Sequence, residues 1–479
     1  MRRFAAYFVL MAAMFTGCAA SCSGGKIDPT PTPETKTSKQ NLTRAIVLAD
    51  AAMANYFTGS NMTMSRYYNP TNNTRSSEVG SVWMYTSAIQ ATAAVINVLD
   101  KEKTGGDSEL YDKYYAKYSQ RLSDLVDNCD YYQGTFTLTS YTQTKEWSVY
   151  GVNRSNAKGG AEVEGVMNVY DDNEWLVREL IEAYKATGQQ KYLDKAEYLA
   201  SYILDGWDCT LDDGKKPYGG ITWGPGYVTK HSCSNGPMVR PLVWLSEHYK
   251  NSSDEITYIY IASDYHRLSK TVKKSEYYLR FAKDIYAWQK GCLLRSDGVY
   301  DDMMGGVSNG DVTYETVYGV KYRRHENTRD RVGPPYSYNS GTMLSGAACL
   351  YSATGEAQYL TDVKALTNAT FTYFAKLGAS KEGYYTYAVT DFNNWFNSVL
   401  MLGYADACSV YQGAEPCIAS FQDNLDYGYD NYLRSETLPT NILVGWSLTS
   451  GNNQTEALTT FAYAAEYAVL AEYELEKGN

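Results

Sequence analysis

The sequence is poor in the groups that metal, phosphate and cofactor chemistry require. Its 479 residues include only four histidines, and none of them stands in an HExxH pattern. The chain has no Walker loop and no GxGxxG motif after a strand-like run, so phosphoryl transfer and dinucleotide cofactors are not indicated. We therefore expect neither a catalytic metal ion nor a cofactor. Carboxylates become the first candidates for reactive groups.

Cysteine and positive charge are limited too. Seven cysteines follow residue 22, an odd and scattered set without a CxxC pair, which argues against a zinc site and against a dense disulfide framework. Bridges between Cys209 and Cys233 and between Cys408 and Cys417 stay open. Lysine and arginine number 43 against 54 acidic residues, a net charge of −11. This balance argues against nucleic acid as a partner and favours a neutral ligand.

Tyrosine is abundant, with 47 residues in a chain that is 14% aromatic. A tyrosine ring offers an apolar face together with a hydroxyl group. That combination suits sugars, whose C–H faces stack on rings while their hydroxyls need hydrogen bonds. For any single tyrosine, packing between helices is the alternative.

The N-terminus reads as an export signal over residues 1–17. A charged start precedes an apolar run over residues 4–15, which is too short to span a membrane permanently. The run ends in a lipobox-like segment, so we expect lipidation of Cys18, with Cys22 as the alternative site and an ordinary secretory signal as the second interpretation. Residues 18–40 are rich in proline and threonine and are typical of a flexible tether. We expect an exported, monomeric protein that is held to the bacterial cell envelope through this lipid anchor alone.

From residue 41 to residue 479, helical periodicity dominates and strand-like alternation is scarce. Residues 184–193 and 351–360 share the pattern Y-x-x-T-G-x-x-x-Y-L at identical spacing, which indicates two similar helix hairpins with a glycine at the end of each first helix. Further helices are predicted over 42–56, 82–99, 111–125, 277–289, 391–411 and 455–475.

The intervals between these hairpins are too long and uneven for an open solenoid of about 34-residue repeats. We therefore predict one all-α domain over residues 41–479, a closed ring of helix pairs with loops around a central cleft.

Three adjacent aspartate pairs compete as reactive groups: Asp171-Asp172, Asp212-Asp213 and Asp301-Asp302. The second lies in a lysine-flanked turn sequence, which favours a solvated turn. For the third, a cleft and a solvated loop are equally compatible with the sequence. The first leads straight into an amphipathic helix and is framed by aromatic residues, so we expect the chemistry there. The alternative is a capping box, with Asp171 as N-cap and Glu174 at the third helical position.

Three blocks in order carry a resemblance to a known family. They are VYDDNEW at 169–175, GGITW at 219–223 with KxxCSNGP at 230–237, and YSYNSGT at 336–342. Together they resemble glycoside hydrolase family 76, the endo-α-1,6-mannanases, over about residues 45–470. The resemblance implies an (α/α)6 barrel and retaining hydrolysis of α-1,6-mannan, with Asp171 as the nucleophile and Asp172 as the general acid/base.

Other side chains near these blocks are candidates for lining the cleft or contacting sugar hydroxyls. They are Tyr170, Asn173, Trp175, Trp223, Asn235, Asp297, Tyr336, Tyr338 and Asn339.

Two segments depart from the family pattern. Asn393-Asn394 replaces a usual Lys-Gly pair, and Lys230-His231-Ser232 differs from a usual Lys-Asn, so chain-length and branch preferences are not predicted. Two other functions stay open, a mannan transglycosylase of the same family and a non-catalytic surface lipoprotein that binds glycans.

Overall fold

The computed structural model describes residues 38–478 except 306–309, 327–329 and 448–452. The predicted signal segment 1–17, the lipidation site Cys18 and the tether up to residue 37 lie outside the described residues. Helix α1 begins at Ser38, before the domain start expected at residue 41.

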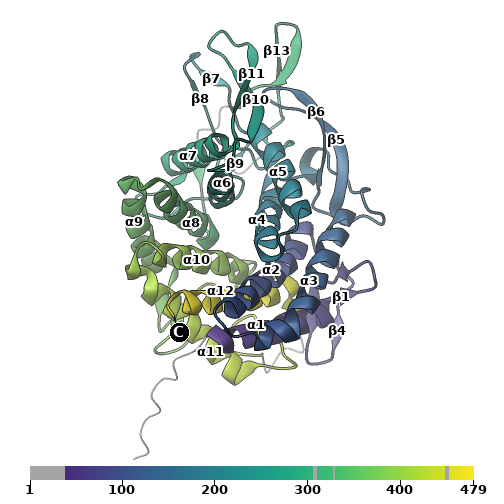
Figure 1. Cartoon of the computed structure of the whole chain (residues 1–479), viewed down its shortest axis with the longest axis vertical. Coiled ribbons are helices and arrows are strands. Elements are labelled where there is room, and N and C mark those ends of the chain that lie inside the picture. Colours follow the sequence, from purple (N-terminus) through teal and green to yellow (C-terminus); the bar gives the residue numbers. More distant parts are fainter. Residues whose placement is uncertain (1–37, 306–309, 327–329, 448–452, 479) are drawn as a thin grey trace, which may run out of the picture. The chain divides into compact units, whose positions relative to one another are not determined.

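Twelve α-helices account for most of the described chain (Figure 1). They are α1 Ser38–Tyr56, α2 Val82–Thr104, α3 Glu109–Cys129, α4 Tyr170–Thr187, α5 Gln190–Asp205, α6 Gly236–His248, α7 Lys274–Leu293, α8 Ser337–Thr354, α9 Ala357–Phe374, α10 Asn393–Cys408, α11 Glu415–Tyr432 and α12 Ala457–Glu476. Every helix predicted from periodicity is present, and the boundaries differ by a few residues at most of the ends.

The helices form a closed double ring. The even-numbered helices α2, α4, α6, α8, α10 and α12 pack in sequence, and α12 returns to pack against α2. Helices α3, α5, α7, α9 and α11 each follow one inner helix and pack outside it, while α1 packs against α12. The purple first helix therefore lies against the yellow last helix in Figure 1. This is the predicted (α/α)6 barrel.

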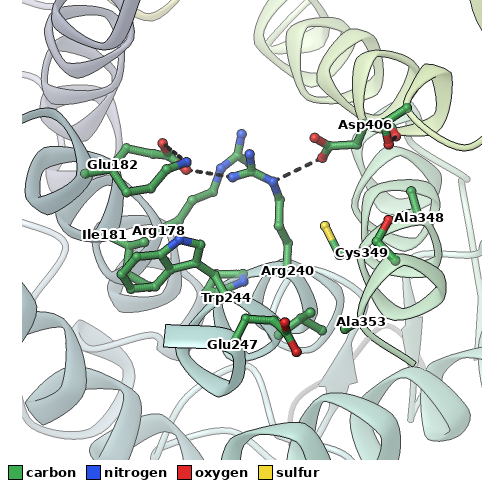
Figure 2. A pocket seen from close by; sticks show the side chains of 15 residues that line it. Arg178, Ile181, Glu182, Arg240, Trp244, Glu247, Ala348, Cys349, Ala353 and Asp406 are labelled. Carbon is green, nitrogen blue, oxygen red and sulfur yellow. Dashed lines mark hydrogen bonds and ion pairs between the residues drawn. The ribbon is translucent and has the colours of Figure 1, made fainter. Parts of the chain in front are cut away.

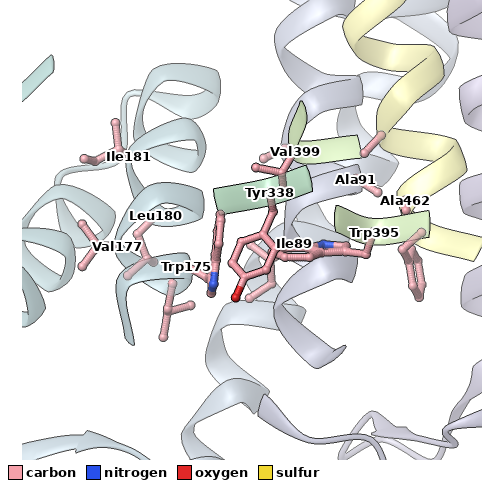
Figure 3. Close-up of a cluster of buried hydrophobic side chains, with 14 of the residues drawn as sticks. Ile89, Ala91, Trp175, Val177, Leu180, Ile181, Tyr338, Trp395, Val399 and Ala462 are labelled. Carbon is pink, nitrogen blue, oxygen red and sulfur yellow. The ribbon is translucent and has the colours of Figure 1, made fainter. Parts of the chain in front are cut away.

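Most residues of the inner helices are buried because neighbouring helices enclose them. Helix α2 is long and apolar enough to cross a membrane, but 78% of its most apolar stretch is buried inside the barrel. A helix that is hydrophobic all round is typical of a protein core. Figure 3 shows part of this core, where Trp175, Tyr338 and Trp395 meet from three inner helices.

The two predicted hairpins end their first helices in the same way. Gly188 follows α4 with φ 68° and Gly355 follows α8 with φ 69°. The Gly188 N–H donates to the Tyr184 carbonyl at 2.7 Å, and the Gly355 N–H donates to the Tyr351 carbonyl at 2.8 Å. Glycine adopts this left-handed conformation without the clash that a Cβ atom brings. The repeated T-G pattern is thus a repeated helix stop.

Short strands pair into small sheets between the helices. They are β1 Phe57–Thr58, β2 Thr63–Met64, β3 Tyr67–Asn69, β4 Thr74–Arg75, β5 Gln133–Thr139, β6 Thr144–Tyr150, β7 Leu211–Asp212, β8 Lys216–Pro217, β9 Lys230–His231, β10 Glu255–Ile261, β11 Arg267–Lys273, β12 Met303–Met304, β13 Tyr314–Val317, β14 Val320–Arg323, β15 Arg331–Val332, β16 Lys376–Leu377, β17 Tyr385–Thr386 and β18 Thr455–Glu456.

One of these sheets bears on the cleft described below. Strand β12 pairs with both β9 and β15 in antiparallel register, so Met303 stands opposite His231. The sheet brings residues from the loops before α6 and α8 to the same end of the barrel.

The seven cysteines in the described part of the chain are free thiols. Neither of the two bridges that the sequence left open is present.

Candidate active site

A cleft of about 780 Å³ opens at the end of the barrel where the inner helices begin. Its walls come from the first turns of α2, α4, α8 and α10, with Trp83, Asp171, Tyr338 and Trp395 among them, and from Cys233 just before α6. The N-terminus of a helix carries a partial positive charge and unpaired backbone N–H groups. Several inner helices therefore begin at one pocket, and their N-termini favour negative charge there.

The two aspartates of the first pair lie in the first turn of α4. The helix begins at Tyr170, and its N-cap is Val169. Both Asp171 and Asp172 line the cleft, and the Asp172 backbone N–H donates to Asp171 Oδ1 at 3.0 Å. The capping-box interpretation was therefore wrong, since Asp171 follows the N-cap by two positions.

Glu174, the other half of that capping box, is fully buried. Neither of its carboxyl oxygens has a hydrogen-bond partner among the described residues. Burial, together with the nearby charge of Asp171, raises the pKa of Glu174 well above its usual range. A carboxyl group in this environment stays neutral, so it adds no charge beneath the cleft.

The two aspartates have different surroundings, which give their carboxyl groups different pKa values. Burial raises the pKa of Asp171 to about 6, while the Cys233 thiol and the Trp223 indole work in the opposite direction. Burial and the charge of Asp171 raise the pKa of Asp172 well above its usual range. Near neutral pH, this arrangement offers an ionised Asp171 beside a protonated Asp172. Such a pair can supply a nucleophile or base together with an acid.

Aromatic rings form one wall of the cleft. The predicted residues Trp175, Tyr336 and Tyr338 all line it. The Tyr338 and Phe396 ring centroids lie 4.3 Å apart, and those of Trp175 and Trp395 lie 4.6 Å apart at 84°. The contribution of α10 was missed, although Phe392 at its N-cap, Trp395 and Phe396 lie within five positions. Figure 3 shows that Trp175, Tyr338 and Trp395 fill the space between the inner helices.

The predicted Trp223 stands on another side of the cleft. Its ring stacks on His231 with centroids 4.8 Å apart and planes 19° apart. Burial lowers the pKa of His231 to about 4, so this imidazole is neutral at physiological pH. Its Nε2 lies 2.9 Å from the Thr229 hydroxyl. His231 is therefore a polar but uncharged part of the lining.

A third carboxyl group, that of Asp302, also lines the cleft. Burial raises its pKa to about 6, the amide of Asn339 opposes this rise, and the charge of Asp171 adds to it. Its neighbour Asp301 instead pairs with Arg295 at 3.1 Å and with Arg331 at 2.8 Å. The sequence had left the Asp301-Asp302 pair open between a cleft and a solvated loop. The structure places Asp302 in the cleft lining and buries Asp301 in its ion pairs.

Three predicted residues support the cleft from behind and do not line it. Tyr170 is buried against Tyr202, with ring centroids 5.0 Å apart. Asn173 Oδ1 accepts from the Tyr150 backbone N–H at 3.0 Å. Asn235 Oδ1 accepts from the Ile221 N–H at 2.8 Å. Both amides are fully buried and hydrogen-bond to the backbone of neighbouring segments. The prediction that Tyr170, Asn173 and Asn235 line the cleft was therefore wrong.

Asp297 and Asn339 also stay outside the cleft lining. Asp297 pairs with Arg295 at 2.8 Å on the exposed loop after α7. Asn339 is fully buried in the first turn of α8, and its amide makes no hydrogen bond within normal distance limits to any described residue. Its amide lies near Asp302 and lowers the pKa of that carboxyl group.

In the ranges that the structure describes, no group of three or more His, Cys, Asp or Glu side chains is arranged to hold a metal ion. The chemistry that the cleft offers is that of its carboxyl groups and aromatic rings.

Comparison with known proteins links this architecture to one family. The family model described as glycosyl hydrolase family 76 matches residues 246–412, a stretch that begins after the Asp171-Asp172 pair. A mannan endo-1,6-alpha-mannosidase, DCW1 of Saccharomyces cerevisiae, is 30% identical over 145 residues, which are 30% of this chain and 28% of that protein. The match thus spans less than a third of the yeast relative.

Solved structures match over almost the whole chain. Bt3792 of Bacteroides thetaiotaomicron, a glycoside hydrolase family 76 mannosidase, has a TM-score of 0.65 and 20% identity, with 92% of this chain and 99% of that chain covered. An inactive variant of the alpha-1,6-mannanase GH76A of Salegentibacter, with two consecutive aspartates replaced by asparagine and alpha-1,6-mannotriose bound, gives 0.59 and 17%, with 90% and 99% covered. These matches confirm the barrel, and with the family model they confirm the predicted resemblance.

Proposed function

We propose, from the confirmed likeness to glycoside hydrolase family 76, that this chain is a retaining endo-α-1,6-mannanase that cleaves the backbone of α-1,6-mannan. The observation that carries the proposal is the adjacent pair Asp171 and Asp172, set at the start of an inner helix in a cleft lined with aromatic rings. The yeast relative's name and the mannotriose bound to the Salegentibacter enzyme support the choice of substrate.

In the proposed reaction, protonated Asp172 donates its proton to the glycosidic oxygen while ionised Asp171 attacks the anomeric carbon. The bond to the leaving chain breaks, and a mannosyl group is carried on Asp171. Asp172, now ionised, takes a proton from water, which attacks the same carbon and releases the product. The unequal pKa shifts of the two carboxyl groups support this division of roles.

Substrate positioning is assigned to the aromatic wall and to the third carboxyl group. Rings such as Trp223 and Tyr336, which are partly exposed in the cleft, offer flat apolar surfaces to the C–H faces of mannose. Asp302 adds a hydrogen-bond acceptor next to strand β9, which carries His231. Hydrogen bonds to sugar hydroxyls that tighten in the transition state contribute to catalysis in glycosidases.

The proposal is tested with Asp171→Ala and Asp172→Ala on debranched α-1,6-mannan, following reducing ends and oligosaccharide release. Each variant is expected to lose roughly 10²-fold or more of kcat, since both act directly on the scissile bond. The matched control is Asp212→Ala, which removes an exposed carboxylate from another aspartate pair and is expected to keep full activity.

Full activity in either site variant would contradict the proposal. Tight binding of the mannan without turnover by the native protein would favour a glycan-binding lipoprotein instead. Transfer to an added mannose acceptor in place of water would identify a transglycosylase that uses the same two carboxyl groups.

A further inference from the structure

A second cavity, of about 260 Å³, lies among the later turns of α4, α6, α8 and α10, away from the helix starts that form the cleft (Figure 2). Three cationic side chains line it, Arg178, Lys185 and Arg240. Three acidic ones, Glu182, Glu247 and Asp406, line it as well. Which of these charges are already paired decides what the cavity can bind.

The acidic groups have their donors already. Glu182 accepts from Lys185 and from Arg240, at 2.7 and 2.8 Å. Asp406 pairs with Arg240 Nε at 3.1 Å and accepts from the Ser345 hydroxyl. Figure 2 shows Glu182 and Asp406 joined to the Arg240 guanidinium from two sides. Glu247 is half-exposed and pairs with Lys250 at 3.0 Å.

Arg178 has fewer acceptors around its guanidinium than Arg240 has. Its side chain is only 7% exposed, yet its one ion pair among the described residues runs from Nε to Glu179 Oε1 at 3.5 Å. Burial raises the pKa of Glu179 to about 7, so that partner is only partly charged near neutral pH. The guanidinium also lies 5.3 Å from the Trp175 ring centroid. No described residue accepts from its two terminal nitrogens.

The Arg178 side chain is 7% exposed and lines the cavity, so its terminal N–H groups need an acceptor inside the cavity, which is either water or a bound ligand. Burial lowers the pKa of Arg178, and the positive charge of the neighbouring Arg240 lowers it further. The partial charge of a helix C-terminus does not account for Arg178, since it reaches only about one turn and this residue stands mid-helix.

Apart from Ser352 and Ser409, the rest of the cavity wall is apolar. Ile181, Trp244, Ala348 and Ala353 line it, and Trp244 is held in place by stacking on His248 with centroids 5.0 Å apart. A guanidinium presents a planar fork that matches a carboxylate with two parallel hydrogen bonds. We propose that this cavity binds a small organic carboxylate, with its charged end on Arg178 and its short apolar body against Trp244.

The test is isothermal titration of the full-length protein with butyrate at constant ionic strength. Butyramide, which has the same shape without the charge, and inorganic phosphate, which has the charge without the apolar body, serve as comparison ligands. Saturable butyrate binding at millimolar concentration is expected, with butyramide and phosphate each bound roughly tenfold more weakly or not at all.

Arg178→Met keeps much of the side-chain volume and removes the guanidinium, and it is expected to weaken butyrate binding by about tenfold or more. The control is Arg280→Met, on the exposed face of α7. Equal binding of butyrate and butyramide, stronger binding of phosphate, or unchanged butyrate binding in Arg178→Met would each overturn the proposal. The ligand comparison uses the native protein, so it decides the matter even if Arg178→Met does not fold.

Discussion

Asp171 and Asp172 are neighbours in sequence, but their carboxyl groups meet different surroundings. Asp171 faces the Cys233 thiol and the Trp223 indole, which favour its ionised form. Asp172 has only burial and the charge of Asp171 acting on it, and both favour its protonated form. The difference predicts how the activity responds to pH.

Activity should follow a bell-shaped pH profile. The proposed nucleophile must be ionised, so kcat/KM should fall as the pH drops through about 6, the pKa of Asp171. It should fall again at high pH, where Asp172 loses the proton that it has to donate. Initial rates on α-1,6-mannan between pH 4 and pH 9 measure both limbs.

Asp302→Asn tests the origin of the acidic limb. The charge of Asp171 raises the pKa of Asp302. Because repulsion between two carboxylates acts on both, removing the charge of Asp302 should move the acidic limb to lower pH. Asp297→Asn, which changes an exposed carboxylate paired with Arg295, is the control and should leave the limb in place. An identical shift in both variants would argue against a local effect of Asp302.

The separate roles of the two aspartates can be told apart by the leaving group. An aryl α-mannoside with an acidic phenol needs little protonation as it leaves. Asp172→Ala should therefore retain a much larger share of its first-step rate on this substrate than on mannan, whereas Asp171→Ala should lose both. A burst of phenol release measures the first step. Equal losses on both substrates in Asp172→Ala would contradict its role as the acid.

At this scale, the sequence predicted the pair and four of the aromatic residues that line the cleft, but not which of the other motif residues face it. In a helix, side chains three or four positions apart share a face. Asp171 and Trp175 satisfy that spacing and line the cleft together, whereas Asn173 points to the opposite side and binds the Tyr150 backbone. Membership of a motif therefore did not imply contact with the cleft.

At the scale of elements, helix periodicity and the T-G stops predicted the hairpins well, because both signals are local. The cleft wall from α10 was not predicted. Trp395 reaches the cleft through packing against Trp83 of α2 and Trp175 of α4. Those partners lie far away in sequence, and a local sequence pattern does not predict which helices become neighbours in a closed ring.

The helix stops make a stability prediction. Gly188→Ala and Gly355→Ala should each lower the free energy of unfolding by about 1 kcal/mol, since a Cβ atom is unfavourable at these positive φ values. No other atom lies within 4 Å of either added Cβ, so the cost is one of backbone conformation. Denaturant unfolding followed by circular dichroism measures it.

Gly291→Ala is the matched control. This glycine lies within α7, and an added Cβ atom meets nothing within 4 Å there. Because its backbone is helical, alanine should stabilise the protein by roughly 0.5 kcal/mol. Destabilisation of all three variants by the same amount would show that the positive φ values are not the cause.

At the scale of the whole molecule, we propose that the barrel is exported and anchored through Cys18. The charged and apolar N-terminal segment with its lipobox-like end supports this proposal. Cys18→Ser should abolish incorporation of radiolabelled palmitate in a bacterial host and move the protein from the membrane fraction to the soluble fraction. Cys22→Ser is the control and should leave both unchanged. The reverse pattern would assign the anchor to Cys22.

The pairing of the first helix with the last has a kinetic consequence. The Tyr56 hydroxyl at the end of α1 lies 2.8 Å from the Thr460 hydroxyl in α12, across 404 positions of sequence. Helix α12 also completes the inner ring between α10 and α2. The hairpins can form as the chain emerges, but the ring cannot close until α12 has been synthesised. Closing so long a loop adds an entropic barrier. Early chain termination would therefore leave an apolar seam open along α1 and α2.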